Sequence, residues 1–223
     1  LKEMEKLGAK VTSNNKEAIE DADLIILAVL SGQVKAILEE ISGAVPPEAI
    51  LAAVATGSTV SEIKSIVGEK IKTVLVMPNT AVAIGESMTC LSAAEEDNKA
   101  LETVKELFDL CGKTMIIPEN LMPGATILAA CGVAFFMRYI RAASQGGIQV
   151  GFHAEEAQII AAQTARGASK LMLATGNHPE REIDKVTTPM GCTIAGLNEM
   201  EHNGLSSALI KGILKSYYEL VKI

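Results

Sequence analysis

Short apolar runs alternate with amphipathic segments of helical length through the first half of the chain. Residues 24–29, 50–55 and 73–77 are continuous apolar runs bounded by polar residues, as in strands that a parallel sheet buries on both faces. Residues 33–41 and 59–67 lie between them and read as helices. Strands that alternate with helices in this way predict an α/β sheet with right-handed crossovers.

The same half of the chain carries signals for further elements. Residues 88–92 and 113–117 are expected to be strands that extend the sheet, with a helix over residues 95–110 between them. Residues 10–12 are a candidate for one more short strand. The sequence begins on Leu1, inside a helical pattern and without a signal peptide. We therefore expect that residues precede this point and that the sheet lacks its first strands.

Strand signals stop near residue 119, and five helices are expected from there on. They cover residues 123–149, 153–175, 178–186, 193–202 and 205–221. Gly176-Asn177 is a good stop for the second of them, because these residues tolerate the left-handed conformation in which helices often end. The pattern predicts an α/β domain over residues 1–119 and an all-helical domain over residues 120–223.

The expected helix over residues 153–175 carries small side chains close to one face. They are Ala157, Ala161, Thr164, Ala165 and Ala168. Small side chains let two helices approach closely, so this face predicts a tight helix contact. Two interpretations stay open, namely packing within the chain and contact between two subunits.

Composition and charge narrow the classes of partner. The chain has 20 basic and 27 acidic residues and a net charge of −7, whereas nucleic-acid binding needs a clustered basic surface. The apolar stretch over residues 121–137 is interrupted by Pro123, Gly124 and Gly132 and falls short of the ~20 residues of a membrane span. A buried helix of a soluble protein is favoured. We expect neither nucleic acid nor membrane as a partner.

The four cysteines form no pattern of metal ligands or disulfides. Cys90, Cys111, Cys131 and Cys192 contain no C-x-x-C pair and have no His ligand pattern beside them. They read as free thiols in a reducing compartment. The sequence therefore predicts a cytoplasmic protein without a metal site.

The segment from Thr188 to Thr193 is the leading candidate for a binding site. Pro189-Met190-Gly191 reads as a turn, and the residues after it as the start of a helix. Free N–H groups and the helix dipole at such a start favour an anion, for example a small carboxylate. The hydroxyls of Thr188 and Thr193 would add directed hydrogen bonds. The simpler alternative is that a threonine only caps the helix.

Cys192 in this segment invites a second alternative. A thiol at the start of a helix has a lowered pKa and can act as a nucleophile. Such catalysis needs a base, and no signal in the sequence places His153, His178 or His202 beside Cys192. The carboxylate site is the stronger hypothesis.

A second candidate site follows the predicted parallel strands. Asn79 comes just after residues 73–77, and residues 28–31 and 55–57 follow the other two strands. Ligands of α/β sheets bind outside the carboxyl ends of the strands, so three loops could line one crevice. Ordinary turn chemistry is the alternative, because Pro-Asn and Thr-Gly are common in turns. The sequence contains no G-x-G-x-x-G, and these residues alone do not show a dinucleotide site.

Five motifs, in this order and spacing, resemble the pyrroline-5-carboxylate reductase family. They are Met77-Pro78-Asn79-Thr80, Glu86-Ser87-Met88-Thr89, Ala161-Ala162-Gln163-Thr164, Gly176-Asn177-His178-Pro179 and Val186-Thr187-Thr188-Pro189-Met190-Gly191-Cys192-Thr193-Ile194. The resemblance covers essentially the whole chain and is strongest from about residue 151 onward. It implies an α/β Rossmann-like domain, here incomplete and lacking its first strands, followed by an all-α dimerisation domain.

The resemblance also implies an activity and a set of site residues. Members of the family transfer hydride from NADPH or NADH to the C=N bond of 1-pyrroline-5-carboxylate and so form proline. The substrate carboxylate would be held by Thr188, Gly191, Cys192 and Thr193, and Thr193 would also orient the substrate nitrogen and help deliver a proton. The cofactor would be contacted by Asn15, Ala28, Val29, Leu30, Ser31, Thr56 and Asn79. Members form dimers through the helical domain, often assembled into larger rings, so self-association is expected.

Three places depart from the family pattern. Leu30-Ser31 stands where the family usually has Lys-Pro, and residues 129–134 replace a run of Ser and Gly that ends in Pro-Ala. Met190 replaces the first glycine of a Gly-Gly pair and is expected to narrow the carboxylate pocket or to force a different turn, because methionine resists positive φ. These departures leave open a related dehydrogenase for another small carboxylate, or a paralogue that binds nucleotide and catalyses little. The preference for NADP or NAD depends on residues after the second strand of the fold, which this sequence does not include.

Overall fold

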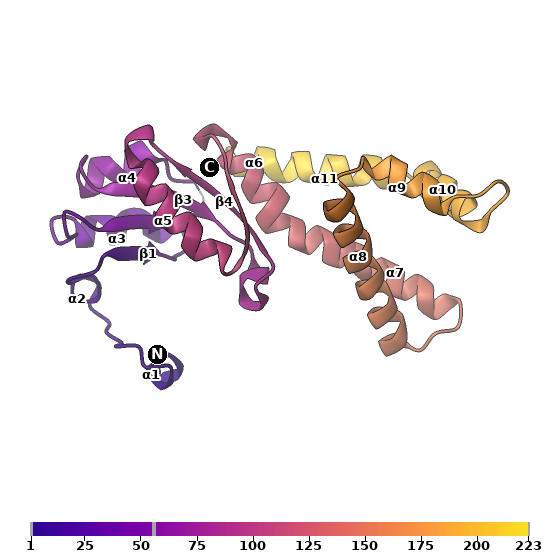
Figure 1. Ribbon diagram of the computed structural model, residues 1–223, viewed down its shortest axis with the longest axis horizontal. Coiled ribbons are helices and arrows are strands. Elements are labelled where there is room, and N and C mark those ends of the chain that lie inside the picture. Colours follow the sequence, from indigo (N-terminus) through magenta and orange to yellow (C-terminus); the bar gives the residue numbers. More distant parts are fainter. Residues whose placement is uncertain (1, 55–56, 223) are drawn as a thin grey trace. The chain divides into compact units, whose positions relative to one another are not determined.

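The computed structural model describes residues 2–54 and 57–222. These residues form two compact units, the first from residues 2–54, 57–131 and 217–222 and the second from residues 132–216. The first unit contains a sheet whose five strands lie in chain order (Figure 1). The strands are β1 (Leu24–Leu27), β2 (Ile50–Ala53), β3 (Lys72–Met77), β4 (Ser87–Ala93) and β5 (Gly112–Ile116).

The direction of the strands changes once along the sheet. β1, β2 and β3 are parallel, β4 is antiparallel to β3, and β5 is parallel to β4. Residues 78–86, with the short helix η2 (Thr80–Ile84), are too few for a crossover, which needs a dozen or more residues. β4 therefore runs back beside β3. The prediction that residues 88–92 and 113–117 extend the sheet is confirmed, although the sequence did not predict the reversal.

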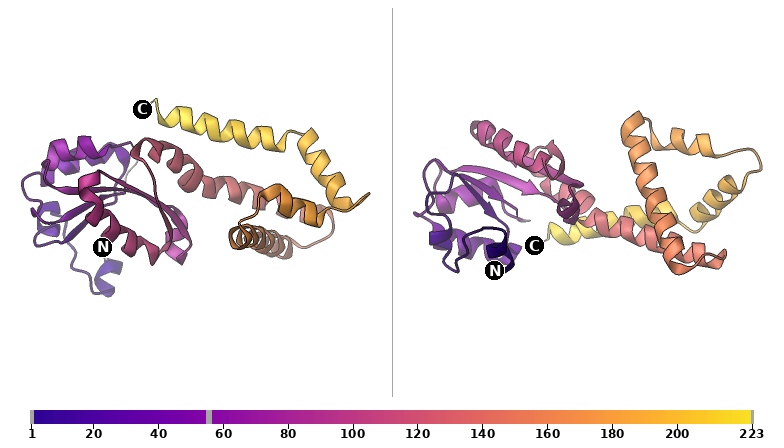
Figure 2. Two further views of the ribbon diagram at one scale, coloured as in Figure 1. Left: turned by 45° about the horizontal axis from the view of Figure 1, so that its top comes forward. Right: turned by 60° about the horizontal axis from the view of Figure 1, so that its bottom comes forward.

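Helices cover both faces of the sheet, as Figures 1 and 2 show. α3 (Val34–Ile41) and α4 (Val60–Val67) pack on one face, and α5 (Asn98–Asp109) packs on the other. Successive side chains of a strand point to opposite faces, so Leu75 joins the core under α3 and α4 while Val76 joins the core under α5. Burial on both faces explains the continuous apolar runs that predicted β2 and β3.

Short helices complete the first unit. They are α1 (Lys2–Lys6), α2 (Asn15–Ala18), η1 (Ser31–Gln33), η3 (Glu95–Asp97), η4 (Glu119–Leu121), α6 (Met122–Ala125) and the π-helix η5 (Thr126–Cys131). A capping box begins α4, because the Thr59 side chain accepts from the N–H of Glu62 and the Glu62 carboxylate accepts from the N–H of Thr59. This box sets the start of the second predicted helix.

A buried ion pair joins α4 to η3. Lys64 and Asp97 are 5% and 6% exposed, and Lys64 Nζ lies 2.8 Å from Asp97 Oδ2 and 3.1 Å from Glu96 Oε1. Asp97 Oδ2 also accepts the backbone N–H of Thr73 in β3. Burial disfavours the charged ammonium, but the hydrogen bonds and charges of Asp97 and Glu96 outweigh this effect and raise the pKa of Lys64. One carboxylate thus ties together three elements of the unit.

Two expectations for the first residues of the sheet are wrong. Residues 10–12 do not form a strand, because a strand needs a hydrogen-bonded neighbour and no described strand pairs with them. β1 is not buried on both faces, since Ile26 is 46% exposed. β1 lies at the edge of the sheet, where less of the structure is available to cover it.

The described residues of the second unit are helical apart from their connections. The helices are α7 (Gly132–Gln149), α8 (Ala154–Thr175), α9 (Pro179–Val186), α10 (Cys192–His202) and α11 (Leu205–Leu220), whose last residues belong to the first unit. The predicted helices after residue 150 are confirmed to within one residue at either end. The helix predicted over residues 123–149 consists instead of α6, the π-helix η5 and α7 in succession.

α7 and α8 pack closely against each other (Figure 2). A Cβ added to Gly147 would lie 2.9 Å from the Cβ of Ala157, and Ala157 is 3% exposed. This part of the small-residue face serves packing within the chain. Thr164 and Ala168 are exposed, so the subunit-contact interpretation stays open for them.

Residues Glu119–Gln149 form one helical stretch that is long and apolar enough to span a membrane by length and composition. A single such helix is weak ground for a membrane protein, because core helices of soluble proteins pass the same test. The expectation that this stretch is buried is wrong for the single chain, since Leu128, Phe136 and Met137 are 68%, 67% and 62% exposed. The described part of the chain covers only some of the apolar circumference of this helix.

Candidate functional site

A tight turn precedes α10. The N–H of Gly191 donates to the carbonyl of Thr188 at 2.9 Å, with Pro189 and Met190 between them. Met190 has φ +59, the sign that the third position of a type II turn requires, and its side chain is fully exposed. Met190 therefore adopts the positive φ that glycine adopts easily. The turn keeps this conformation although methionine occupies the position.

Replacing Met190 by glycine is expected to stabilise the protein by about 1 kcal/mol. A side chain in the left-handed region costs roughly 1–2 kcal/mol, and the greater entropy of glycine in the unfolded chain offsets part of the gain. Because the Met190 side chain is fully exposed, little burial is lost. Urea unfolding of both proteins measures the change, and a loss of stability in Met190→Gly would contradict the strained conformation.

Gly191 permits a close contact with Thr188. The φ of Gly191 is −74, which any residue adopts, but a Cβ there would lie 2.5 Å from the Oγ1 of Thr188 and 3.0 Å from its carbonyl oxygen. Glycine at this position lets the Thr188 hydroxyl lie beside the start of α10. The turn thus brings two of the candidate residues together.

The first turn of α10 presents backbone donors. Gly191 is the N-cap and no described side chain caps the helix. The N–H of Ala195 bonds the Gly191 carbonyl, which leaves the N–H groups of the three preceding residues without intrahelical acceptors, and the helix dipole adds partial positive charge there. Thr193 lies inside this first turn and not at the cap. N-capping therefore does not explain Thr193, and an anion site remains the better interpretation.

Cys192 is exposed, and within the described part of the chain none of the three histidines forms a hydrogen bond to its thiol. His178 accepts the N–H of Glu180 through Nδ1 at the start of α9, and His153 is the N-cap of α8. His202 ends α10, ten residues away and so about 15 Å along the helix axis. The geometry gives no support to a nucleophilic Cys192.

The carboxyl ends of β1, β2 and β3 lie at one edge of the sheet, because these strands are neighbours and run in parallel. Ala28 and Val29 follow β1, and Asn79 lies two residues after β3. Thr56, which follows β2, lies outside the described residues. The strand order therefore supports the prediction that these loops share an edge.

Leu30 and Ser31 form the entry to the helix after β1. Leu30 has an extended conformation, and its carbonyl accepts the N–H of Gln33 at 2.8 Å. Ser31 begins η1, and both residues are exposed. Their side chains are thus accessible to a ligand at this edge.

A hollow of about 220 Å³ beside β1 brings Asn15 together with Ala28 and Val29. The rest of its lining is apolar and comes from α2, β1 and α3. The Asn15 amide donates to Glu40 Oε2 at 2.9 Å, so it is already oriented. An apolar hollow of this size fits one part of a dinucleotide, such as a ring, and no basic residue among its lining serves the phosphates. Asn79 is not part of this lining.

Asn79 is held by three hydrogen bonds at the end of β3. Its N–H donates to Ser87 Oγ at 3.1 Å, its Oδ1 accepts the N–H of Ala81 at 2.9 Å, and its Nδ2 donates to the carbonyl of Ala129 at 3.3 Å. These bonds fix which end of the amide faces which way. One Nδ2 hydrogen remains for a ligand.

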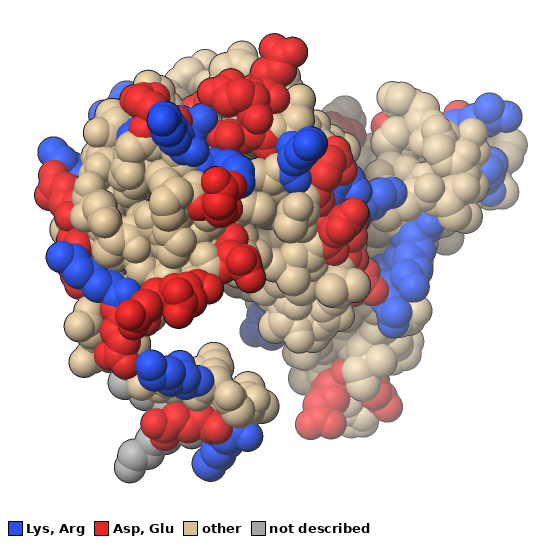
Figure 3. Space-filling view, turned by 60° about the vertical axis from the view of Figure 1, so that its left-hand side comes forward, with Lys and Arg blue, Asp and Glu red and all other residues tan. Residues whose placement is uncertain are grey.

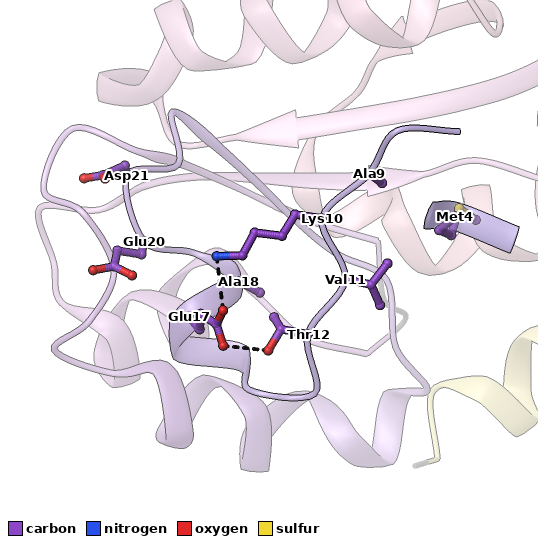
Figure 4. Close-up of a pocket in the computed structure, with 9 residues that line it drawn as sticks. All are labelled: Met4, Ala9, Lys10, Val11, Thr12, Glu17, Ala18, Glu20 and Asp21. Carbon is purple, nitrogen blue, oxygen red and sulfur yellow. Dashed lines mark hydrogen bonds and ion pairs between the residues drawn. The ribbon is translucent and has the colours of Figure 1, made fainter. Parts of the chain in front are cut away.

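A larger hollow, of about 490 Å³, lies between residues 4–12 and α2 (Figure 4). Inside it, Thr12 Oγ1 donates to Glu17 Oε2 at 2.8 Å, and Lys10 Nζ lies 3.1 Å from Glu17 Oε1. The hydrogen bond from Thr12, followed by the hydrogen bond and charge of Lys10, lowers the pKa of Glu17. These polar groups bind one another, and none of the candidate site residues lines this hollow.

The charges on the α/β unit are mixed. Acidic and basic side chains are interspersed on the face shown in Figure 3, without a broad basic patch on that face. This distribution agrees with the net charge of −7.

Two features near Asn79 were not predicted as parts of a site. The first is the π-helix η5, which contains Ala129 and the first half of the run that departs from the family pattern. The second is a pair of buried hydroxyls, Ser87 and Thr89, whose Oγ and Oγ1 atoms lie 3.0 Å apart. The motif Glu86-Ser87-Met88-Thr89 carried the signal for this pair, but the sequence did not show where the side chains point.

A sheet covered by helices on both faces, followed in the chain by a helical unit, places the protein in the class of Rossmann-like α/β folds. A family model described as "Pyrroline-5-carboxylate reductase dimerisation" matches residues 119–221. "Pyrroline-5-carboxylate reductase 2" of Dictyostelium discoideum is 46% identical over 224 residues, which cover 94% of this chain and 75% of that protein. The chain belongs to the pyrroline-5-carboxylate reductase family.

Further comparisons agree with this assignment. "Pyrroline-5-carboxylate reductase 1" of Dictyostelium discoideum is 43% identical over 228 residues, and the chain spans 97% of its own length but only 41% of that protein. The crystal structure of 1-pyrroline-5-carboxylate reductase from Streptococcus pyogenes superposes with a TM-score of 0.89 at 25% identity, covering 100% of this chain and 85% of that one. The Plasmodium falciparum enzyme with NADP bound gives a TM-score of 0.85 at 24% identity, covering 93% and 79%, and shows the same fold.

Proposed function

We propose that the protein reduces 1-pyrroline-5-carboxylate to proline with NADPH or NADH. The observation that carries this proposal is the turn from Thr188 to Gly191, followed by a helix start with uncapped N–H groups. Such a site suits the carboxylate of a small imino acid. The relatives that are 43% and 46% identical carry the name of this activity.

The bound nicotinamide would supply the hydride, while the protein supplies binding and orientation. The N–H groups of Cys192 and Thr193, with the hydroxyl of Thr188 beside Gly191, would hold the carboxylate. Thr193, on the first turn of α10, would place its hydroxyl near the substrate nitrogen and help deliver the proton that completes the reduction. Reduction of a C=N bond needs both that proton and the hydride.

The cofactor would be held by residues of the α/β unit. They are Asn15, Ala28, Val29, Leu30, Ser31, Thr56 and Asn79. Support comes from the shared edge of β1, β2 and β3 and from the apolar hollow that joins Asn15 to Ala28 and Val29. In α/β sheets of this kind ligands bind at the carboxyl ends of the strands.

Self-association is the second part of the proposal. The matched family model is a dimerisation domain, and the helical unit leaves many large apolar side chains exposed, among them Phe136, Ile159 and Leu173. Exposed apolar surface of this kind marks an interface. A dimer formed through the helical unit, able to assemble into a larger ring in the cytoplasm, accounts for it. The domain boundary at residue 119 is proposed on the same grounds.

Replacing Thr193 by valine should lower kcat/KM for 1-pyrroline-5-carboxylate by about 100-fold, because positioned proton transfer contributes at least that much. Thr193→Ser keeps the hydroxyl and should stay near the unaltered protein. The NADPH dissociation constant, measured without substrate, should be the same in both variants. Loss of folding in Thr193→Val would point to a structural role instead.

The full-length protein should oxidise NADPH or NADH when 1-pyrroline-5-carboxylate is added, and proline should appear in equal amount. Cofactor binding without turnover of any cyclic imine would favour a paralogue that binds nucleotide and catalyses little. Turnover of another imine or oxo acid alone would favour a different small carboxylate as substrate. Both outcomes would overturn the proposed activity.

A further inference from the structure

A series of hydrogen bonds connects two buried hydroxyls of β4 to Asn79, which follows β3. Thr89 Oγ1 and Ser87 Oγ are 3.0 Å apart, and Ser87 Oγ accepts the N–H of Asn79 at 3.1 Å. Asn79 Nδ2 then reaches the carbonyl of Ala129 in the π-helix η5 at 3.3 Å. Thr89 and Ser87 are 0% and 2% exposed, so the series starts in the core and ends at a half-buried amide.

The sequence explains why a side chain takes part here. The pairing of β3 with β4 ends at Met77 and Cys90, and Pro78 has no N–H to continue the ladder. The next N–H, that of Asn79, needs another acceptor, because an unpaired backbone donor in a partly buried position is costly. The Ser87 hydroxyl is that acceptor. The Ser87 hydroxyl, beside that of Thr89, thus takes the place of one backbone hydrogen bond of the β3–β4 ladder, just after β3 ends.

We propose that Ser87, supported by Thr89, is a positioning residue of the cofactor site and acts through Asn79. This inference rests on the proposed function, in which Asn79 contacts the nicotinamide cofactor. The Ser87 hydroxyl fixes the backbone of Asn79, and the Ala81 N–H and the Ala129 carbonyl fix its amide. The Asn79 amide would therefore contact the cofactor in a single orientation, in which it is also hydrogen-bonded to the π-helix η5.

The π-helix is the other end of this arrangement. π-helical turns are rare and occur frequently at functional sites, and η5 occupies residues Thr126–Cys131 between α6 and α7. The bond from Asn79 to Ala129 is a direct link between η5 and the end of β3. A substitution at Ser87 that lets Asn79 reorient would break this link, and it would change none of the residues that are proposed to bind the substrate.

Ser87→Ala is expected to raise the dissociation constant of NADPH about tenfold. Without the hydroxyl, the N–H of Asn79 loses its acceptor and the amide is free to take other orientations, so binding must order it again. Amide hydrogen exchange of Asn79 in the cofactor-free protein should become faster by at least tenfold, which reports the loss directly. The KM for 1-pyrroline-5-carboxylate at saturating NADPH should stay nearly constant.

Two threonines of the same sheet provide a matched control. Thr89→Val removes the support for Ser87, whereas Thr73→Val removes an equally buried hydroxyl that donates to the Ile71 carbonyl at the start of β3. The two substitutions should destabilise the protein to a similar extent. Only Thr89→Val should weaken NADPH binding, by about two- to threefold.

Calorimetric titration with NADPH decides between the outcomes. Equal dissociation constants for the unaltered protein and Ser87→Ala would overturn the positioning role and leave the proposed function intact. Equal weakening by Thr73→Val and Thr89→Val would overturn it as well, because general destabilisation would then be the cause. Failure of the unaltered full-length protein to bind NADPH or NADH would overturn both the inference and the proposed function.

Discussion

Replacing Gly112 by alanine is expected to destabilise the protein by about 3 kcal/mol or more, which is enough to prevent folding in a marginal domain. Gly112 begins β5 with φ +145, a conformation that side chains rarely adopt. A Cβ there would overlap the backbone carbonyl oxygen and nitrogen of Ser87 in the neighbouring strand. The Ser87 backbone is held in place, since Ser87 is paired with Gly112 in the β4–β5 ladder and donates its N–H to the Cys111 carbonyl.

Gly43→Ala is the matched control for this prediction. Gly43 also has positive φ, +78, but a Cβ there would meet nothing within 4 Å. This variant should therefore lose only the cost of the backbone conformation, roughly 1–2 kcal/mol. Urea unfolding of both variants separates the cost of the positive φ from the cost of the atomic overlap. If Gly112→Ala were no less stable than Gly43→Ala, the close approach of β4 and β5 would be contradicted.

Lys64→Met should cost about 3–5 kcal/mol, the usual result of removing one partner from a buried ion pair. The methionine fills a similar volume but leaves the Asp97 carboxylate, 6% exposed, without its cation. Lys72→Met provides the control, because Lys72 pairs with Glu48, whose side chain is 91% exposed. That exposed pair should contribute less than about 1 kcal/mol. Similar losses in the two variants would contradict the structural role of Lys64.

The same ion pair predicts a pH dependence. The folded protein raises the pKa of Lys64 above its ordinary 10.5, so the folded state favours the charged form. The stabilisation is fully present below pH 10.5 and is lost as the pH rises through the higher folded pKa. The difference in stability between the unaltered protein and Lys64→Met should thus be constant near neutral pH and shrink only in strong alkali.

The strands and helices of this chain were predictable where periodicity was strong. β2 and β3 are buried on both faces, so their apolar runs were unambiguous, and the later helices end at clear stop signals such as Gly176, which has φ +63. The direction of β4 was missed although the sequence contained the signal, because residues 78–86 are too few for the crossover that a parallel strand needs. Residues 10–12 were mistaken for a strand because a local pattern does not reveal whether a neighbouring strand exists.

The candidate site was predictable only in part. Pro189 and Gly191 indicated the turn that begins at Thr188. The structure contains the hydrogen bond of this turn, from the Gly191 N–H to the Thr188 carbonyl. The π-helix was not predictable, because the residues of η5 read equally well as α-helix, and its bond to Asn79 joins positions 50 residues apart. The exposure of Phe136 and Met137 was also hidden, since an apolar helix face looks the same whether it packs in its own core or against a partner. The roles of the individual site residues stay predictions.

Transfer of deuterium from the cofactor to the product tests the central claim most directly. The full-length protein is incubated with 1-pyrroline-5-carboxylate and NADPH or NADH that carries deuterium at the transferable position of the nicotinamide, and the product is analysed by mass spectrometry and NMR. We predict proline with one deuterium on the carbon of the former C=N bond for each cofactor oxidised. Absence of proline with either cofactor, or proline that lacks the label, would contradict hydride transfer to 1-pyrroline-5-carboxylate by this protein.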